Sequence, residues 1–129
     1  MPRFEGGCLC GRMRYPAGEL PHAPHYCHCR MCQRVVGAPV VAWVNFPRTA
    51  FSFTAAEPAF YQSSPGIRRG FCPACGSSLC TIVEDRDDHV CVTIATLDDP
   101  AAIAPGYHIW TESQLPWLNL AGDLPRRLQ

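Results

Sequence analysis

Seven of the nine cysteines lie in three short clusters, and these clusters restrict the possible folds more than any other feature of the sequence. Thiolate sulfurs with one or two residues between them can turn toward a single soft cation such as Zn²⁺. Glycines beside the first and the last cluster supply the backbone freedom that such a turn requires. The three clusters are Cys8 with Cys10, Cys27 with Cys29 and Cys32, and Cys72 with Cys75.

The clustered cysteines divide naturally into four and three. The first and last clusters together predict a closed structural zinc site, which would tie residue 8 to residue 75 and so restrict the unfolded chain. The middle cluster has three thiols, one fewer than a closed tetrahedral site needs. Because a catalytic zinc keeps one position for water or substrate, the middle cluster predicts an open, catalytic site.

Other divisions of the cysteines stay open at this point. Cys80, Cys91, His25 or His28 could complete the middle cluster as a second closed site, although His28 lies between two predicted ligands and is expected to point away. An iron–sulfur cluster is a further alternative, but the C-x-C pairs do not match the usual ferredoxin spacings. We interpret Cys80 and Cys91, which lie in predicted strands, as small buried hydrophobic residues.

Length and charge narrow the class of protein. A chain of 129 residues is long enough for one domain, which we place at residues 1–129. Its 11 basic and 11 acidic residues balance, which argues against general attraction to nucleic acid or to a membrane surface. The first residues lack the apolar run of a signal peptide. We therefore expect a soluble, cytoplasmic protein whose cysteines bind metal rather than form disulfides.

Strand signals dominate the chain. A single helical turn is expected over residues 30–36, closed by Gly37. Pro65 and Gly66 stand where a type II turn needs them, between the strands of a hairpin. An acidic turn at 84–88 joins the strands of a second hairpin. Strands are predicted over residues 12–15, 40–46, 51–54, 59–62, 67–69, 77–83 and 90–97, and a Pro-rich connection over 16–25.

Further motifs accompany the cysteines in a fixed order. They are Gly7-Cys8-Leu9-Cys10-Gly11, Cys27-His28-Cys29 with Cys32, Gly37-Ala38, Phe71-Cys72-Pro73-Ala74-Cys75-Gly76-Ser77, Leu97-Asp98-Asp99-Pro100, His108-Ile109-Trp110 and Pro116-Trp117. This set resembles the glutathione-dependent formaldehyde-activating enzyme family, whose relatives include the zinc domain of centromere protein V. The resemblance runs from Gly6 to Leu124, which is nearly the whole chain.

The resemblance implies a mainly β fold, a β-tent of several coiled antiparallel sheets with short helical turns. The activity it implies is the condensation of formaldehyde with glutathione to S-(hydroxymethyl)glutathione, a carbon–sulfur lyase reaction run in reverse. The chain departs from the family in two places: Gln33 stands where Arg is frequent, and Ser113-Gln114-Leu115 stands where Ser-Lys is frequent. The implied ligands are Cys8, Cys10, Cys72 and Cys75 for a structural zinc, and Cys27, Cys29 and Cys32 for a second, catalytic zinc.

We hypothesise that zinc on the middle cluster holds the thiol of glutathione as a thiolate, which is the nucleophile that the reaction needs. Arg30 or Arg34 would then pair with a carboxylate of the substrate. One alternative is a non-catalytic zinc-binding interaction module that uses the same surface. Another is redox sensing by the exposed thiols.

Four large side chains near these motifs have less specific interpretations. His108 is interpreted as a buried, hydrogen-bonded structural histidine rather than as an acid or base. Trp43, Trp110 and Trp117 are interpreted as core residues rather than as a surface that binds substrate.

Overall fold

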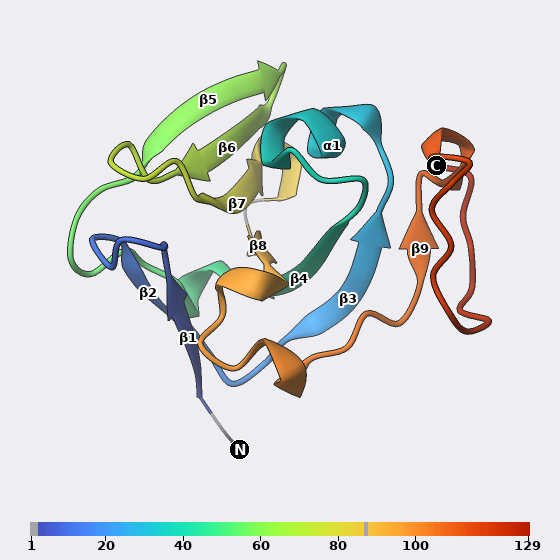
Figure 1. The fold of residues 1–129 in the computed structure, drawn as a ribbon. Helices are drawn as coiled ribbons and strands as arrows, with labels where there is room; N and C mark the ends of the chain where they lie inside the picture. The colour runs from blue at the N-terminus through green and yellow to red at the C-terminus, as the bar shows by residue number, and fades with distance from the viewer. Residues whose placement is uncertain (1–2, 87) are drawn as a thin grey trace.

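The computed structural model describes residues 3–86 and 88–129, and most of its regular elements are β-strands. A two-stranded ribbon, β1-β2, accompanies a seven-stranded sheet with the order β5-β6-β7-β8-β4-β3-β9 (Figure 1). The predicted mainly β class is confirmed. The strands are β1 (Phe4–Gly7), β2 (Arg14–Gly18), β3 (His22–Cys27), β4 (Val41–Pro47), β5 (Ala59–Ser64), β6 (Ile67–Phe71), β7 (Ser78–Val83), β8 (His89–Thr93) and β9 (His108–Ile109).

The helical elements are short. The helix α1 (Arg30–Val36) begins after Cys29, whose Sγ accepts a hydrogen bond from the N–H of Cys32 at 3.2 Å. It ends at Gly37, whose φ of +72° is the left-handed conformation that glycine adopts without strain. The other helical elements are the 3₁₀ turns η1 (Arg48–Ala50), η2 (Glu84–Arg86), η3 (Ile94–Thr96), η4 (Pro100–Ala102) and η5 (Thr111–Ser113).

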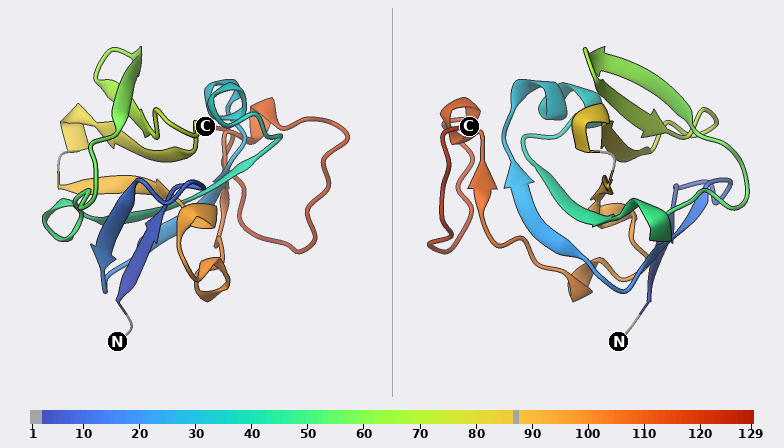
Figure 2. Two further views of the ribbon diagram at one scale, coloured as in Figure 1. Left: turned by 60° about the vertical axis from the view of Figure 1, so that its left-hand side comes forward. Right: turned by 180° about the vertical axis from the view of Figure 1, so that it is seen from behind.

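The arrangement of the elements leaves α1 between two ends of the molecule. The β5-β6 hairpin lies at one end, and the C-terminal segment runs beside β9 at the other (Figures 1 and 2). Paired strands are antiparallel except β3 and β9, which pair in parallel. The turn from β3 into α1 therefore lies close to both the large sheet and the C-terminal segment.

The main core lies between the ribbon and the middle strands of the large sheet. Tyr15 of β2, Phe46 of β4 and Val92 of β8 are fully buried in it, and burial of such apolar surface is the main stabilising term in a fold of this kind. The hydroxyl groups of Tyr15 and Thr96 form a hydrogen bond of 2.8 Å, which joins the ribbon to η3.

The ribbon packs so closely on this core that Gly6 has no room for a side chain. A Cβ atom there would lie 2.3 Å from the carbonyl oxygen of Thr96 and 2.5 Å from the hydroxyl of Tyr15. The first obstacle is backbone, so it could not move aside without shifting η3. Close approach, rather than a special φ angle, is what requires glycine at this position.

Several sequence predictions are corrected by the fold. The strand predicted at 51–54 is wrong, because Phe51 and Phe53 pack their rings against Tyr15 in an irregular segment. The connection predicted at 16–25 is also wrong, because β2 continues to Gly18 and β3 begins at His22. Pro16 is accommodated because β2 is an edge strand, which needs only one row of hydrogen bonds.

Two further differences concern strand ends and turns. The strand predicted at 90–97 ends at Thr93, and residues 94–96 form η3 instead. Residue 87 of the predicted acidic turn lies outside the described residues. The helical turn predicted at 30–36 is confirmed with the same bounds, and so are the strands around residues 40–46, 59–62, 67–69 and 77–83.

The prediction that all three tryptophans are core residues is only partly right. Trp43 is buried, with 3% of its surface exposed. Trp110 and Trp117 are 37% and 68% exposed, which contradicts the prediction for both. Trp110 has a φ of +56° at the start of η5, and this left-handed turn directs the chain out of the sheet.

Candidate metal centres

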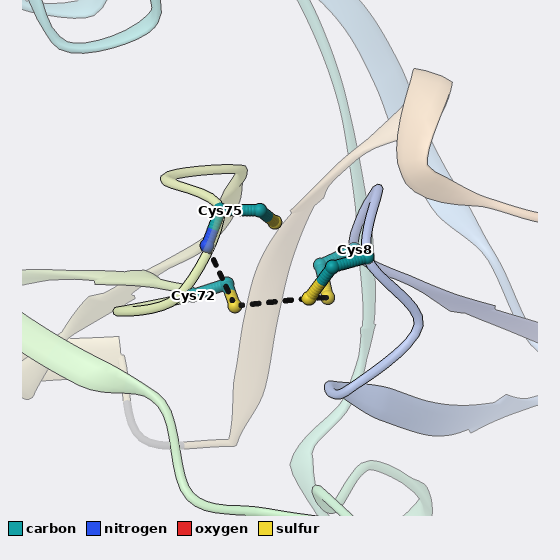
Figure 3. Close-up of side chains that lie close together, drawn as sticks. Cys8, Cys72 and Cys75 are labelled. Atoms are coloured by element: carbon teal, nitrogen blue, oxygen red, sulfur yellow. Dashed lines mark hydrogen bonds between the residues drawn. The ribbon is translucent and has the colours of Figure 1, made fainter.

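The first candidate metal centre joins the ribbon to the loop after β6. Cys8 and Cys10 follow β1, and Cys72 and Cys75 follow β6. Their four sulfurs lie within 4.8 Å of one another, with 3.5 Å between Cys8 and Cys10 and 3.8 Å between Cys10 and Cys72. Figure 3 shows the thiol groups of Cys8, Cys72 and Cys75 turned toward one another from these two segments.

The geometry of this centre fits zinc. A tetrahedral zinc with Zn–S bonds of about 2.3 Å holds its sulfurs about 3.8 Å apart. The N–H of Met13 donates to Cys8 Sγ at 3.2 Å, which favours the thiolate form. The hydroxyl of Ser77 lies 3.2 Å from Cys75 Sγ and lowers the pKa of that thiol to about 5. The same hydroxyl accepts a hydrogen bond from the N–H of Leu9 at 3.1 Å, so it also links the two segments.

The second candidate metal centre lies where β3 runs into α1. Cys27 ends β3, Cys29 is the N-cap of α1, and Cys32 belongs to its first turn. The three sulfurs lie within 4.8 Å of one another, which is close enough for all three to bind one zinc ion. Cys27 and Cys32 are buried, whereas Cys29 is half-buried. The local turn thus aims three thiols at one point.

Among the described residues, no fourth ligand atom of a His, Cys, Asp or Glu lies within 4.8 Å of all three sulfurs. Cys91 and His25 line the cavity over this centre, outside that distance. His28 Nε2 instead pairs with His108 Nδ1 at 2.9 Å. Cys80 is buried in the main core, where burial raises its pKa to about 12. The middle cluster therefore has three thiols as its described protein ligands.

Arg69 of β6 is the charged partner of these thiols. It is buried, its Nη1 donates to Cys32 Sγ at 3.4 Å, and its Nε donates to Ser63 Oγ at 3.0 Å. Hydrogen bonds from Cys27 and Cys29 lower the pKa of Cys32, and Arg69 lowers it further. The pKa of Cys27 is instead raised by its neighbours Cys29 and Cys32. Crowded thiols thus keep part of their protons until a cation balances the charge.

A cavity of about 400 Å³ opens over the middle cluster, and we call it the thiol pocket. A cavity of this size suits a small molecule. Trp43 of β4 and Cys91 of β8 form part of its wall. The lining also includes His25, Arg69, Arg86, His89, Tyr107, Ile109, Trp110 and Arg127.

His28 and His108 form a buried pair beside the second centre. Their ring centroids lie 5.1 Å apart, and Tyr26 stacks on His108 at 5.0 Å. Burial lowers the pKa of both histidines, that of His28 to about 4. Both rings are therefore neutral at pH 7. His108 is buried and hydrogen-bonded, as its structural interpretation requires.

Arg30 and Arg34, the arginines predicted to hold the substrate, do not line the thiol pocket. They line a separate shallow hollow that includes Trp117. Arg30 Nη1 donates to Gln33 Oε1 at 2.5 Å, and Gln33 Nε2 donates to the carbonyl oxygen of His28 at 2.7 Å. Buried Gln33 thus braces the turn that carries the middle cluster. The pairing of Arg30 or Arg34 with a substrate stays a prediction.

Sequence reasoning missed the arginines that do line the thiol pocket, which are Arg69, Arg86 and Arg127. They come from β6, from η2 and from the C-terminal segment, which lie far apart in the sequence. None belongs to a local motif.

Fold and site together define a mainly β protein with two thiol clusters able to hold metal. A family model described as glutathione-dependent formaldehyde-activating enzyme matches residues 3–113. The chain belongs to this family, which confirms the resemblance.

Proteins similar to the chain include a curated lyase and a solved structure. An uncharacterized lyase of Schizosaccharomyces pombe is 31% identical over an alignment of 86 residues, and the match covers 61% of this chain and 57% of that protein. The chain thus spans just over half the length of this curated relative. The crystal structure of a Rhodobacter sphaeroides protein matches with a TM-score of 0.60 and 19% identity, and covers 95% of this chain and 98% of that chain. This second likeness supports the fold alone. None of the described helices is both long and apolar enough to cross a membrane.

Proposed function

We propose that the protein is a zinc-dependent carbon–sulfur lyase that acts on adducts of glutathione with formaldehyde or another small aldehyde. The observation that carries this proposal is a set of three converging thiols, one ligand short of a tetrahedron, beneath a cavity of about 400 Å³. Membership of the family supports the choice of substrate. Two zinc ions per chain are proposed, a structural ion on Cys8, Cys10, Cys72 and Cys75 and a catalytic ion on Cys27, Cys29 and Cys32.

The charge of the second centre explains the need for a cationic residue. Zinc bound there would supply the positive charge that keeps a substrate thiol deprotonated at neutral pH. Three thiolates already exceed the charge of a divalent ion by one, and a substrate thiolate adds another. Arg69, with Nη1 at 3.4 Å from Cys32 Sγ, offsets part of this excess. It therefore favours binding of a fourth sulfur.

The proposed reaction balances without an oxidant or a reductant. In the direction of synthesis, the substrate sulfur forms a bond to the aldehyde carbon while the carbon–oxygen π bond breaks. The oxygen takes a proton from water, and the thiol proton leaves to the solvent. In the reverse direction the hydroxyl proton leaves to water, the carbon–oxygen π bond re-forms, the carbon–sulfur bond breaks with its electron pair returning to sulfur, and the aldehyde leaves. Trp43 and Ile109 provide apolar walls that limit access of water to this site.

We also infer that the protein works in a reducing compartment such as the cytoplasm. All nine cysteines are free thiols, and seven of them lie in the two candidate metal centres. An oxidising compartment would convert such neighbouring thiols to disulfides and prevent metal binding.

The proposed function is tested by exchange spectroscopy of formaldehyde with glutathione at equilibrium. The zinc-loaded protein should speed up the exchange between free formaldehyde and S-(hydroxymethyl)glutathione. Cys32→Ser should return the rate to the background, because it removes one of the three ligands. Cys80→Ala is the matched control, since Cys80 is a buried thiol outside both centres. Cys80→Ala should exchange formaldehyde at the same rate as the unchanged protein.

An exchange rate equal to the uncatalysed background would contradict the lyase proposal. That result would favour a binding module that uses the same pocket. A full rate in Cys32→Ser would contradict the assignment of the middle cluster as the reactive centre.

A further inference from the structure

Three arginines line the thiol pocket, namely Arg69, Arg86 and Arg127. Its two histidines add little positive charge, because burial lowers the pKa of His25 and His89 Nδ1 lies 3.0 Å from Asp88 Oδ1. Within residues 3–86 and 88–129, no Asp or Glu side chain belongs to that lining. Arg69 already contacts the sulfur of Cys32. Among the described residues, Arg127 has no such partner, so its charge gives the pocket a preference for anions.

Arg127 comes from the part of the chain beyond residues 3–113, to which the family model is matched. Its backbone is fixed by β9 and η5: the N–H of Arg127 donates to the carbonyl oxygen of His108 at 2.9 Å. The N–H and hydroxyl of Thr111 donate to the carbonyl oxygen of Arg127 at 3.0 and 2.9 Å. The segment therefore lies beside β9 as a further strand-like edge, and its position does not depend on the Arg127 side chain.

Alternation along this edge sends neighbouring side chains to opposite faces. Arg127 lies over the ring of Tyr107, with its guanidinium carbon 4.8 Å from the ring centroid, and both residues line the thiol pocket. Arg126 lines the separate hollow around His108 and donates to Gln114 Oε1. Two adjacent arginines thus face two different cavities.

The guanidinium of Arg127 forms no ion pair or hydrogen bond with a side chain in the described part of the protein. Stacking on Tyr107 restricts its orientation and leaves its N–H groups available. A planar guanidinium held in this way matches a carboxylate, which can accept two parallel hydrogen bonds. A ligand whose sulfur reaches the middle cluster could place a carboxylate here.

We propose that Arg127 is a specificity-determining residue, which binds a carboxylate of the thiol substrate and makes the pocket select anionic thiols over neutral ones. This inference rests on the proposed function, because it takes the middle cluster as the place where the substrate sulfur binds. It assigns to the C-terminal segment a role in choosing the substrate.

The test measures thiol binding rather than catalysis. Cobalt(II) replaces zinc in the full chain, and the change of its absorption spectrum reports a thiolate entering the open position. Glutathione and its diethyl ester are the two probes, since the ester lacks both carboxylates. The measured quantity is the ratio of the two dissociation constants. It is compared between the unchanged protein, Arg127→Gln, Arg127→Lys and the matched control Arg126→Gln.

The unchanged protein should bind glutathione more tightly than the ester, and Arg127→Gln should weaken glutathione binding about tenfold, as loss of one charge-assisted hydrogen bond predicts. The ester should be bound equally by both proteins. Arg127→Lys should restore part of the preference, and Arg126→Gln should leave it unchanged.

Three results would overturn the inference, and they distinguish the role of Arg127 from the proposed function. Equal loss of preference in Arg127→Gln and Arg126→Gln, or no preference in any protein, would overturn the role of Arg127 while thiol binding stands. A cobalt spectrum that neither probe changes would overturn both this inference and the proposed function.

Discussion

A buried arginine needs a negative partner, and Arg69 finds it in sulfur rather than in a carboxylate. Only 7% of its surface is exposed, and its described partners are Cys32 Sγ and Ser63 Oγ. An isolated buried cation would cost several kcal/mol, so the position makes sense only beside a site that carries negative charge. Arg69 is therefore independent support for thiolates in the middle cluster.

Replacing Arg69 should weaken the second metal centre and spare the first. In Arg69→Met, the excess negative charge of the three thiolates loses its partner, and the metal should leave roughly ten times faster. The measurement is release of zinc to a coloured chelator, which should show a fast phase from the open site and a slow phase from the closed one.

The matched control for this change is Arg68→Met. Arg68 is the next residue of β6, and its guanidinium stacks on Phe60 at 4.8 Å, away from the thiols. Arg68→Met should leave both the fast and the slow phase of zinc release unchanged. If both variants accelerate release equally, or if Arg69→Met changes only the slow phase, the role assigned to Arg69 is wrong.

The residues of the candidate centres were predictable to different degrees. The seven thiols have local spacing that predicts ligands, and the structure gathers them into the same groups of four and three. Arg69 lies 37 residues from Cys32 along the chain. Arg127 lies beyond residues 3–113, to which the family model is matched. Such contacts depend on strand register and on the return of the chain to the sheet, which no local pattern encodes.

At the scale of elements, the close contact between ribbon and core is the least tolerant part of the fold. Gly6→Ala should destabilise the protein by about 1–3 kcal/mol, because the added methyl would meet the carbonyl oxygen of Thr96. Urea unfolding of the zinc-loaded protein measures the change. Gly106→Ala is the control, because the nearest atom to a Cβ there is the carbonyl oxygen of Pro24 at 3.8 Å.

The control should be neutral or slightly stabilising, since alanine reduces the freedom of the unfolded chain. A loss of stability in Gly106→Ala as large as that in Gly6→Ala would mean that close packing does not explain the requirement for glycine at position 6.

The elements that could be predicted are those with a local signal. Gly37 ends α1, and a run of β-branched and aromatic residues marks β4. The two-residue strand β9 has no periodic pattern and exists because β3 and the C-terminal segment lie on its two sides. The strand β3 was missed because Pro24 and its two histidines obscure the alternation of a half-buried strand.

At the scale of the whole molecule, the two candidate centres lie at different kinds of junction. The first connects the ribbon to the loop after β6, where a bound metal would hold the two sheets together. The second lies within a single turn from β3 to α1, under an open cavity, so the sheets do not depend on it. One centre is thus suited to hold the fold and the other to bind a substrate.

The most direct test of this division compares two variants in which one cysteine is replaced. Native mass spectrometry measures their zinc content, and circular dichroism measures whether they fold. The unchanged chain should bind two zinc ions. Cys32→Ser should bind one and keep its β spectrum, whereas Cys75→Ser should lose the folded spectrum. If both variants lose the fold to the same extent, or if Cys32→Ser still binds two ions, the division into a closed structural centre and an open reactive centre is contradicted.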